Sequence, residues 1–171
     1  RAAPARQSVF LWVDEDPGRA ERVQRGEVAV SQVKPGIAHG VPHGLIHDWI
    51  GAVFVPETTL ADFFAMARDY DDYPKWYNPT ISQAHLLSRN GDDDRFTIRY
   101  VRTVLWVTAV IEIEYETHYS QVDSTRWYSV ARSTRIQEIK EHGQPDEHKM
   151  APEHGSGYLW RAYSVSRYEQ R

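Results

Sequence analysis

Apolar positions in the first part of the chain follow a helical spacing and then a mostly alternating one. Between Val9 and Arg25 they recur at the spacing of one helix face, and Gly26 follows as a stop signal. Between Glu27 and Val33 the valines are spaced as in a short strand. The pattern therefore predicts an N-terminal extension, residues 1–43, that holds a short helix and a short strand.

A longer apolar stretch extends from Gly44 to Pro56. Alternate positions place Leu45, His47 and Trp49 on one face, and the positions between them are mostly apolar as well. A strand that is apolar on both faces is typically covered on both sides. We expect one covered strand here, with His47 near its start, where the polar tip of its ring still reaches water or a ligand.

Three histidines, His39, His43 and His47, are spaced by four residues at the start of this stretch. On one face of a helix they could share a metal ion. Two glycines and a proline within the run disfavour a helix, and residues four apart on an extended chain are roughly 13 Å from one another. The histidines therefore predict a turn that enters a strand, and no metal site.

The segment after Pro56 carries the signals of two short helices. Thr59 suits the N-cap of the first helix, whose apolar face ends near Asp69. That face consists of Leu60, Phe63, Phe64 and Ala67. Pro74 suits the first turn of a second helix, which Pro79 ends.

The remainder of the chain alternates as antiparallel strands do. The predicted strands are Ile81–Ser88, Arg95–Val101, Leu105–Glu116, Arg126–Ile139 and Tyr158–Tyr168. The acidic segment Asn90–Asp94 lacks the glutamate of a calcium loop and predicts a solvated hairpin turn. We also expect a bend at Arg102–Val104 and a long loop at Lys140–Gly157. A strand, two helices and an antiparallel meander together predict an α+β fold.

Composition narrows the class of protein. A chain of 171 residues suits one domain, and the absence of cysteine excludes disulfides, thiolate catalysis and cysteine-bound metals. The net charge of −4 is spread over mixed charges, so the chain has no basic stripe for nucleic acid. No apolar run is long enough for a membrane span. The small residues among Arg1–Ala5 are common near signal-peptidase sites, so we expect a soluble protein for which export is open, with its compartment otherwise undetermined.

The segment Asp69–Tyr77, Asp-Tyr-Asp-Asp-Tyr-Pro-Lys-Trp-Tyr, follows a strand that ends in Val-Pro and precedes long antiparallel strands. This layout resembles the START-like (SRPBCC) helix-grip superfamily of lipid-binding START domains, plant ligand binders and bacterial polyketide cyclase-like proteins. The resemblance covers residues 44–171 and implies a curved antiparallel sheet around a ligand cavity. The family's long C-terminal helix has no counterpart before Arg171. The domain is therefore expected to be C-terminally incomplete, or its cavity to be covered by residues 9–25 or another molecule.

Candidate ligand-binding residues combine aromatic rings with arginines. They are His47, Trp49, Trp76, Tyr77, Arg99, Arg135, Trp160 and Tyr163. An arginine among apolar strand neighbours needs a carboxylate or a ligand anion. The two explanations are a ligand head group and cross-strand ion pairs with Glu112, Glu114 and Glu116 on an outer face.

The resemblance and the aromatic content favour binding of a hydrophobic or amphipathic small molecule, lipid-like or polycyclic, more than catalysis. One alternative is a polyketide cyclase or aromatase-like enzyme in which His47 or a tyrosine moves a proton. Another is an interaction module that uses the concave sheet, for example in a homodimer. No cofactor or metal is expected, since the loop histidines His142, His148 and His154, at a spacing of six, match no common zinc pattern.

Overall fold

A computed structural model describes residues 9–33, 39–41, 44–152 and 154–171. Contacts divide the chain into two compact units, Arg1–Thr58 and Thr59–Arg171, which are described separately. The predicted domain limits at residues 43 and 44 stay a prediction. The expectations for residues 1–5 and for His43 concern positions outside the described residues.

The first unit contains the predicted short helix and strand. Its elements are η1 (Trp12–Glu15), α1 (Pro17–Gln24), β1 (Ala29–Gln32), β2 (His39–Val41), β3 (Gly44–Ile46) and β4 (Trp49–Ala52). Asp16 caps α1 by accepting a hydrogen bond from the backbone N–H of Arg19, and Pro17 occupies the first turn. Gly26, with φ of 94°, follows the helix as expected.

The single covered strand predicted for residues 44–56 is wrong. The structure divides it into β3, which pairs with β2, and β4, which pairs with β1. His47 and Asp48 separate the two strands, and β4 ends at Ala52. Because each strand belongs to a two-stranded ribbon, Leu45 and Trp49 are exposed, not covered.

The second unit begins with the predicted helix pair. These elements are α2 (Leu60–Ala67), the 3₁₀ turn η2 (Tyr70–Asp72) and α3 (Tyr73–Trp76). Thr59 and Asp62 form a capping box at the start of α2, in which the Thr59 hydroxyl accepts the Asp62 N–H at 3.1 Å. Pro74 lies in the first turn of α3, as the sequence predicts.

Removing this cap should measurably destabilise the second unit. We expect Thr59→Ala to lower its free energy of unfolding by about 1 kcal/mol, because the N–H of Asp62 in the first turn of α2 loses the hydroxyl that accepts its hydrogen bond. Urea denaturation followed by far-UV circular dichroism measures the change. Thr58→Ala is the matched control, since the Thr58 hydroxyl only donates to the carbonyl of Pro56 outside the helix. Equal effects of the two substitutions would contradict the capping role.

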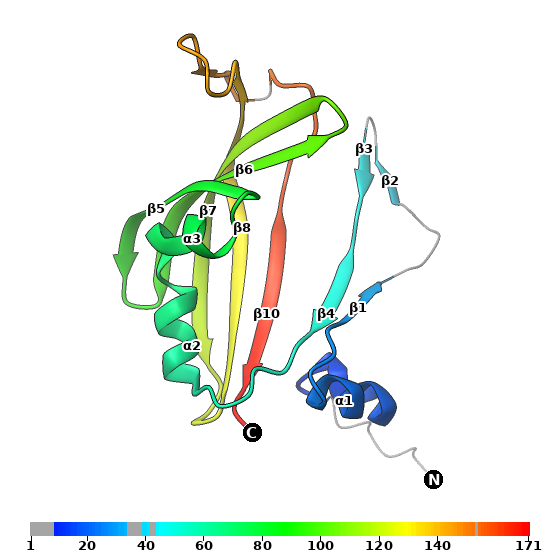
Figure 1. Ribbon diagram of the computed structural model, residues 1–171. Coiled ribbons are helices and arrows are strands. Elements are labelled where there is room, and N and C mark those ends of the chain that lie inside the picture. Colours follow the sequence, from blue (N-terminus) through cyan, green and yellow to red (C-terminus); the bar gives the residue numbers. More distant parts are fainter. Residues whose placement is uncertain (1–8, 34–38, 42–43, 153) are drawn as a thin grey trace. The chain divides into compact units, whose positions relative to one another are not determined.

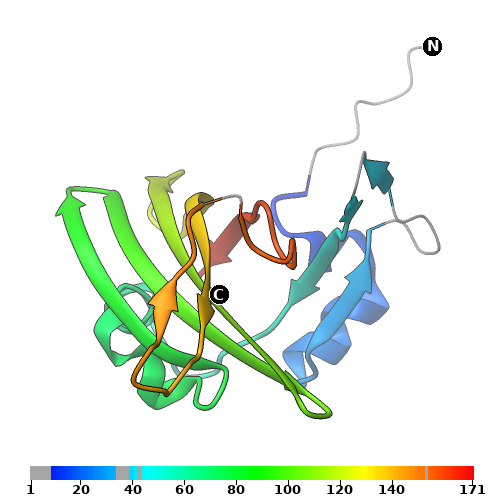
Figure 2. The ribbon, with the colours of Figure 1, turned by 90° about the horizontal axis from the view of Figure 1, so that it is seen from above.

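The predicted meander is an antiparallel sheet of six strands. They are β5 (Ile81–Asn90), β6 (Asp93–Val104), β7 (Val107–Gln121), β8 (Arg126–Lys140), β9 (His148–Lys149) and β10 (Tyr163–Glu169). The order is β10-β8-β7-β6-β5, with β9 paired to β8, and the sheet is curled (Figures 1 and 2). This α+β arrangement is compatible with a helix-grip-like fold. No helix among the described residues is long and apolar enough to cross a membrane.

Several strand boundaries differ from the sequence pattern, and the short strand β9 lies within the loop predicted for residues 140–157. The bend expected at Arg102–Val104 is wrong, because β6 continues through it and the chain turns at Leu105 and Trp106 instead. Leu105 adopts φ of 57°, which a tight hairpin turn requires and which leucine rarely adopts. The last strand begins at Tyr163, so Trp160 precedes it.

Alternation along the strands gives the sheet two different faces. On one face, termed the helix face, Ile81, Ala84, Phe96 and Ile98 form a buried core with Tyr70 of η2. Phe64 of α2 extends this contact through edge-to-face packing on Tyr119, Trp127 and Tyr168. The opposite face, termed the open face, carries a set of charged residues from three strands: Arg95 and Arg99 of β6, Glu112, Glu114 and Glu116 of β7, and Arg132 and Arg135 of β8.

Candidate functional site

A group of tyrosines occupies the helix face beside α3. Tyr73 and Tyr77, at the two ends of α3, pack edge to face with ring centroids 5.4 Å apart. Tyr73 also contacts the buried core, together with Tyr100 of β6 and Tyr115 of β7. We term Tyr73, Tyr77, Tyr100 and Tyr115 the tyrosine cluster.

Tyr100 and Tyr115 supply polar groups within this aromatic wall. Both side chains are half-buried and pack against the core. Burial raises the pKa of each phenol above its usual value, most strongly for Tyr115. Tyr100 and Tyr115 therefore present neutral hydroxyl groups at physiological pH.

Two predicted residues lie at the edge of this cluster. Trp76 is 62% exposed at the end of α3. Tyr77, which caps that helix, is also exposed, but its ring rests on Tyr73. Their role in ligand binding stays a prediction, and of the two only Tyr77 has a ring contact with a half-buried aromatic side chain among the described residues.

A buried carboxylate ties the helices to the β5–β6 hairpin. Asp94 is 1% exposed and accepts hydrogen bonds from Arg68 Nε at 2.8 Å, Arg89 Nε at 2.8 Å and the Tyr70 hydroxyl at 2.9 Å. Tyr70 in turn shares a hydrogen bond with Tyr119. The prediction that all of Asn90–Asp94 is solvated is therefore wrong for Asp94. Alternation turns this residue onto the helix face, where only the paired arginines make its burial tolerable.

Arg99 forms ion pairs on the open face. Its guanidinium donates to Glu112 of β7 at 2.9 Å and to Glu147 of the loop between β8 and β9 at 2.8 Å. Arg132 pairs with Glu116 in the same way, at 2.8 Å. Cross-strand pairing, one of the two explanations from the sequence, is thus confirmed for these two arginines.

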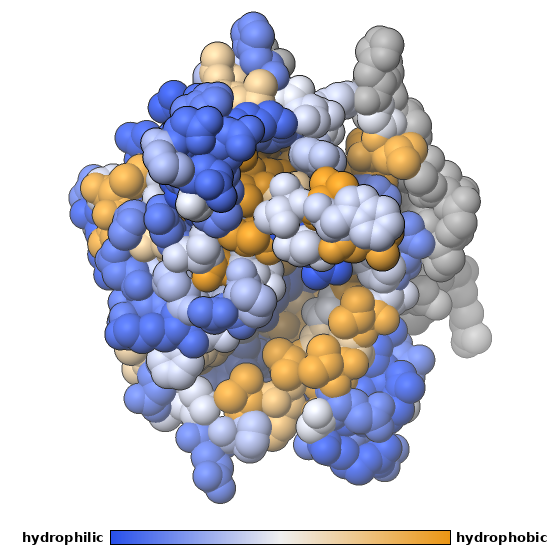
Figure 3. Space-filling view, turned by 45° about the horizontal axis from the view of Figure 1, so that its top comes forward, coloured by the Kyte–Doolittle hydropathy of each residue, from blue (hydrophilic) through white to orange (hydrophobic). Residues whose placement is uncertain are grey.

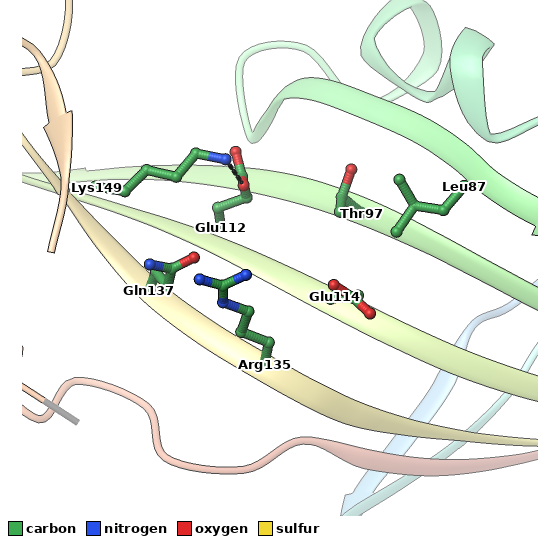
Figure 4. A pocket seen from close by; sticks show the side chains of 7 residues that line it. All are labelled: Leu87, Thr97, Glu112, Glu114, Arg135, Gln137 and Lys149. Atoms are coloured by element: carbon green, nitrogen blue, oxygen red, sulfur yellow. Dashed lines mark hydrogen bonds and ion pairs between the residues drawn. The ribbon is translucent and has the colours of Figure 1, made fainter. Parts of the chain in front are cut away.

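Arg135 lines a small pocket on the open face (Figure 4). The pocket has a volume of about 140 Å³ and is lined by Leu87, Thr97, Glu112, Glu114, Arg135, Gln137 and Lys149. Lys149 pairs with Glu112, and Arg95 pairs with Glu114. The Arg135 side chain extends along the sheet on the side of Gln137 (Figure 4).

The other predicted residues are spread over the chain. His47 and Trp49 belong to the first unit. Trp160 precedes β10, and its indole ring lies close to Gly157. A Cβ at position 157 would be 3.2 Å from the indole Nε1. Tyr163 of β10 lies opposite Arg132 of β8. Its side chain is on the open face and is 69% exposed. Within the second unit, the structure brings Trp76 and Tyr77 together on one face of the sheet, and Arg99, Arg135 and Tyr163 on the other.

Sequence reasoning missed Tyr100 and Tyr115. The signal was present, because alternation places Tyr100 with Phe96 and Ile98, opposite Arg99. Their proximity to α3 depends on how the helices pack, which no periodicity states.

Among the described residues, no group of three or more histidine, aspartate or glutamate side chains could hold a metal ion. Comparison of the chain with protein-family models, with curated proteins and with solved structures finds no match.

Proposed function

We propose that this protein binds an amphipathic small molecule, lipid-like or polycyclic, at the tyrosine cluster on the helix face of a START-like helix-grip fold. The observation that carries the proposal is that Tyr73, Tyr100 and Tyr115 pack half-buried against the core, while the exposed ring of Tyr77 packs on Tyr73. Ring faces supply apolar contact area, and phenol hydroxyls fix the orientation of a ligand with a few polar atoms.

The open face suits such a ligand poorly. The volume of its pocket is about 140 Å³. Sites for drug-sized ligands have volumes of roughly 300–1,000 Å³, so this pocket is too small. Its carboxylates Glu112 and Glu114 are already ion-paired, so an apolar body placed there would cover charged groups without replacing their partners. The helix face is therefore the favoured binding surface.

The chemistry of the tyrosine cluster also narrows the ligand. Arg99 and Arg135 lie on the opposite face, so neither would meet a ligand bound beside Tyr77. Neutral phenols favour hydroxyl or carbonyl groups on the ligand over a carboxylate or phosphate. We therefore propose an uncharged amphipathic molecule.

The proposal is tested by native mass spectrometry of the purified chain with denaturing extraction, followed by titration with the neutral fluorophore 1-aminoanthracene. We expect Tyr77→Ala to weaken binding about tenfold, since one aromatic contact and its buried area are lost. Tyr163→Ala is the matched control, because it removes a comparably exposed tyrosine from the open face. Its affinity should equal that of the wild type.

Two outcomes would overturn the proposal. An empty chain that does not bind the fluorophore would contradict ligand binding itself. Weaker binding by Tyr163→Ala, with Tyr77→Ala unchanged, would move the ligand to the open face and reject the tyrosine cluster.

A further inference from the structure

The turn between β6 and β7 exposes large apolar side chains. Leu105 is 79% exposed, Trp106 87% and Val107 54%. Exposed apolar side chains are common on protein surfaces. Figure 3 shows several apolar patches on this protein. Leucine and tryptophan are adjacent at the tip of this hairpin, and leaving both exposed forgoes the favourable free energy of burying two large apolar side chains.

This tip stands on an arm that extends beyond the neighbouring strands. The pairing of β5 with β6 begins at Tyr100, and the pairing of β8 with β7 ends at Ile111. In the described strands, Arg102–Val104 pair only with Val107–Ala109. Figure 1 shows this two-stranded arm projecting past β5 and β8.

The arm carries little that would oppose removal from water. Thr103 and Thr108, opposite each other, share a hydrogen bond between their hydroxyls at 3.0 Å. The sequence contains no charged residue between Arg102 and Glu112. The two threonine hydroxyls are hydrogen-bonded to each other, and the backbone groups of the two strands pair with each other. Both kinds of hydrogen bond lower the free-energy cost of removing the outer part of the arm from water.

Size and charge select the partner. The largest side chain of the tip, a tryptophan, offers at most about 250 Å². Three side chains therefore do not reach the roughly 800 Å² per partner of a stable protein interface, which argues against a second copy of this chain. A narrow apolar projection with tryptophan at its end suits the interfacial layer of a lipid bilayer, where aromatic rings are preferred.

We infer that the Leu105–Trp106 tip inserts into the surface of a phospholipid bilayer and docks the protein there. The net charge of −4, with Arg102 as the sole basic residue of the arm, means that apolar insertion provides the attraction. Docking is accordingly independent of anionic lipid and insensitive to salt. This inference concerns a surface separate from the tyrosine cluster and does not rest on the proposed function.

The test is sedimentation of the full chain with phosphatidylcholine vesicles, with and without phosphatidylglycerol, at low and high salt. The variant Leu105→Asn with Trp106→Ser keeps the turn, because asparagine tolerates the positive φ at position 105. We expect it to lower the vesicle partition coefficient at least about tenfold. Tyr158→Ser, which removes an exposed aromatic side chain outside both the tip and the tyrosine cluster, is the control and should partition like the wild type.

Circular dichroism and binding of 1-aminoanthracene establish that the tip variant is folded and keep the two proposals separate. The inference is overturned if wild type and tip variant sediment equally, or if neither binds vesicles. Binding restricted to anionic vesicles and abolished by salt would also overturn it, because that result identifies charge and not the apolar tip.

Discussion

Asp94→Asn should lower the free energy of unfolding of the second unit by about 3–5 kcal/mol, the cost of breaking a buried charge pair by removing one partner. The amide keeps the size of the carboxyl group but carries no charge. Arg68 and Arg89 would then lose the anion that each contacts through two nitrogens, at 2.7 and 2.8 Å from Arg68 and at 2.8 and 3.1 Å from Arg89. Urea denaturation monitored by circular dichroism measures the loss.

The same carboxylate gives stability a defined pH dependence. Burial alone would raise the pKa of Asp94, but hydrogen bonds from Arg68, Arg89 and Tyr70 outweigh it and hold the pKa below 3.8. A pKa that is lower in the folded state than in the unfolded state stabilises the fold above the unfolded value. We therefore expect this contribution to be intact above about pH 4 and to disappear as the pH falls further, with a shallower acid dependence for Asp94→Asn.

The adjacent residue provides the control. Asp93 lies on the same strand, but its side chain is 66% exposed in a pair with His118. Asp93→Asn should change the free energy of unfolding by less than about 0.5 kcal/mol. If the two substitutions had equal effects, the buried network would not hold the helices to the hairpin.

Arg99→Met should lower the free energy of unfolding by about 2 kcal/mol, because Glu112 loses a charged hydrogen-bond partner while it stays half-buried. Burial alone would raise the pKa of Glu112. The hydrogen bonds and charges of Lys149 and Arg99 outweigh this effect and hold the pKa of Glu112 below its usual value. Methionine preserves the apolar stem of Arg99 but not its charge. Chemical denaturation measures the loss, and titration with 1-aminoanthracene should give an unchanged affinity.

Arg95→Met separates this effect from a general loss of positive charge. Arg95 lies four residues before Arg99 on the same face, but its side chain is 52% exposed and pairs with Glu114 and Glu116. Its replacement should destabilise the protein much less than Arg99→Met. Lower ligand affinity in Arg99→Met without loss of stability would instead support the ligand role that the sequence assigned to this arginine.

Local signals located most elements of the second unit. Thr59 before an apolar helical stripe predicted α2, and Pro74 predicted the start of α3, because caps and proline act within one turn of the chain. Alternation predicted the long strands of the meander, since each strand has one face on a core. The turn at Leu105 and Trp106 gave no such signal, because it contains no glycine, asparagine or aspartate.

Sequence by itself determined the α+β class, the helix pair before the antiparallel meander and the presence of arginines that need carboxylate partners. Tertiary structure alone decided which partners they meet: Arg99 meets Glu112 and Glu147, and Asp94 is enclosed by Arg68 and Arg89. It also separated the predicted ligand residues, because Arg99, Arg135 and Tyr163 lie on the face of the sheet opposite Tyr77, whereas His47 and Trp49 belong to the first unit. The physical reason is the separation in sequence over which each interaction acts. Caps, turns and alternation depend on residues that are near neighbours in the chain. Ion pairs and ring contacts depend instead on strand register and on how the helices pack against the curled sheet.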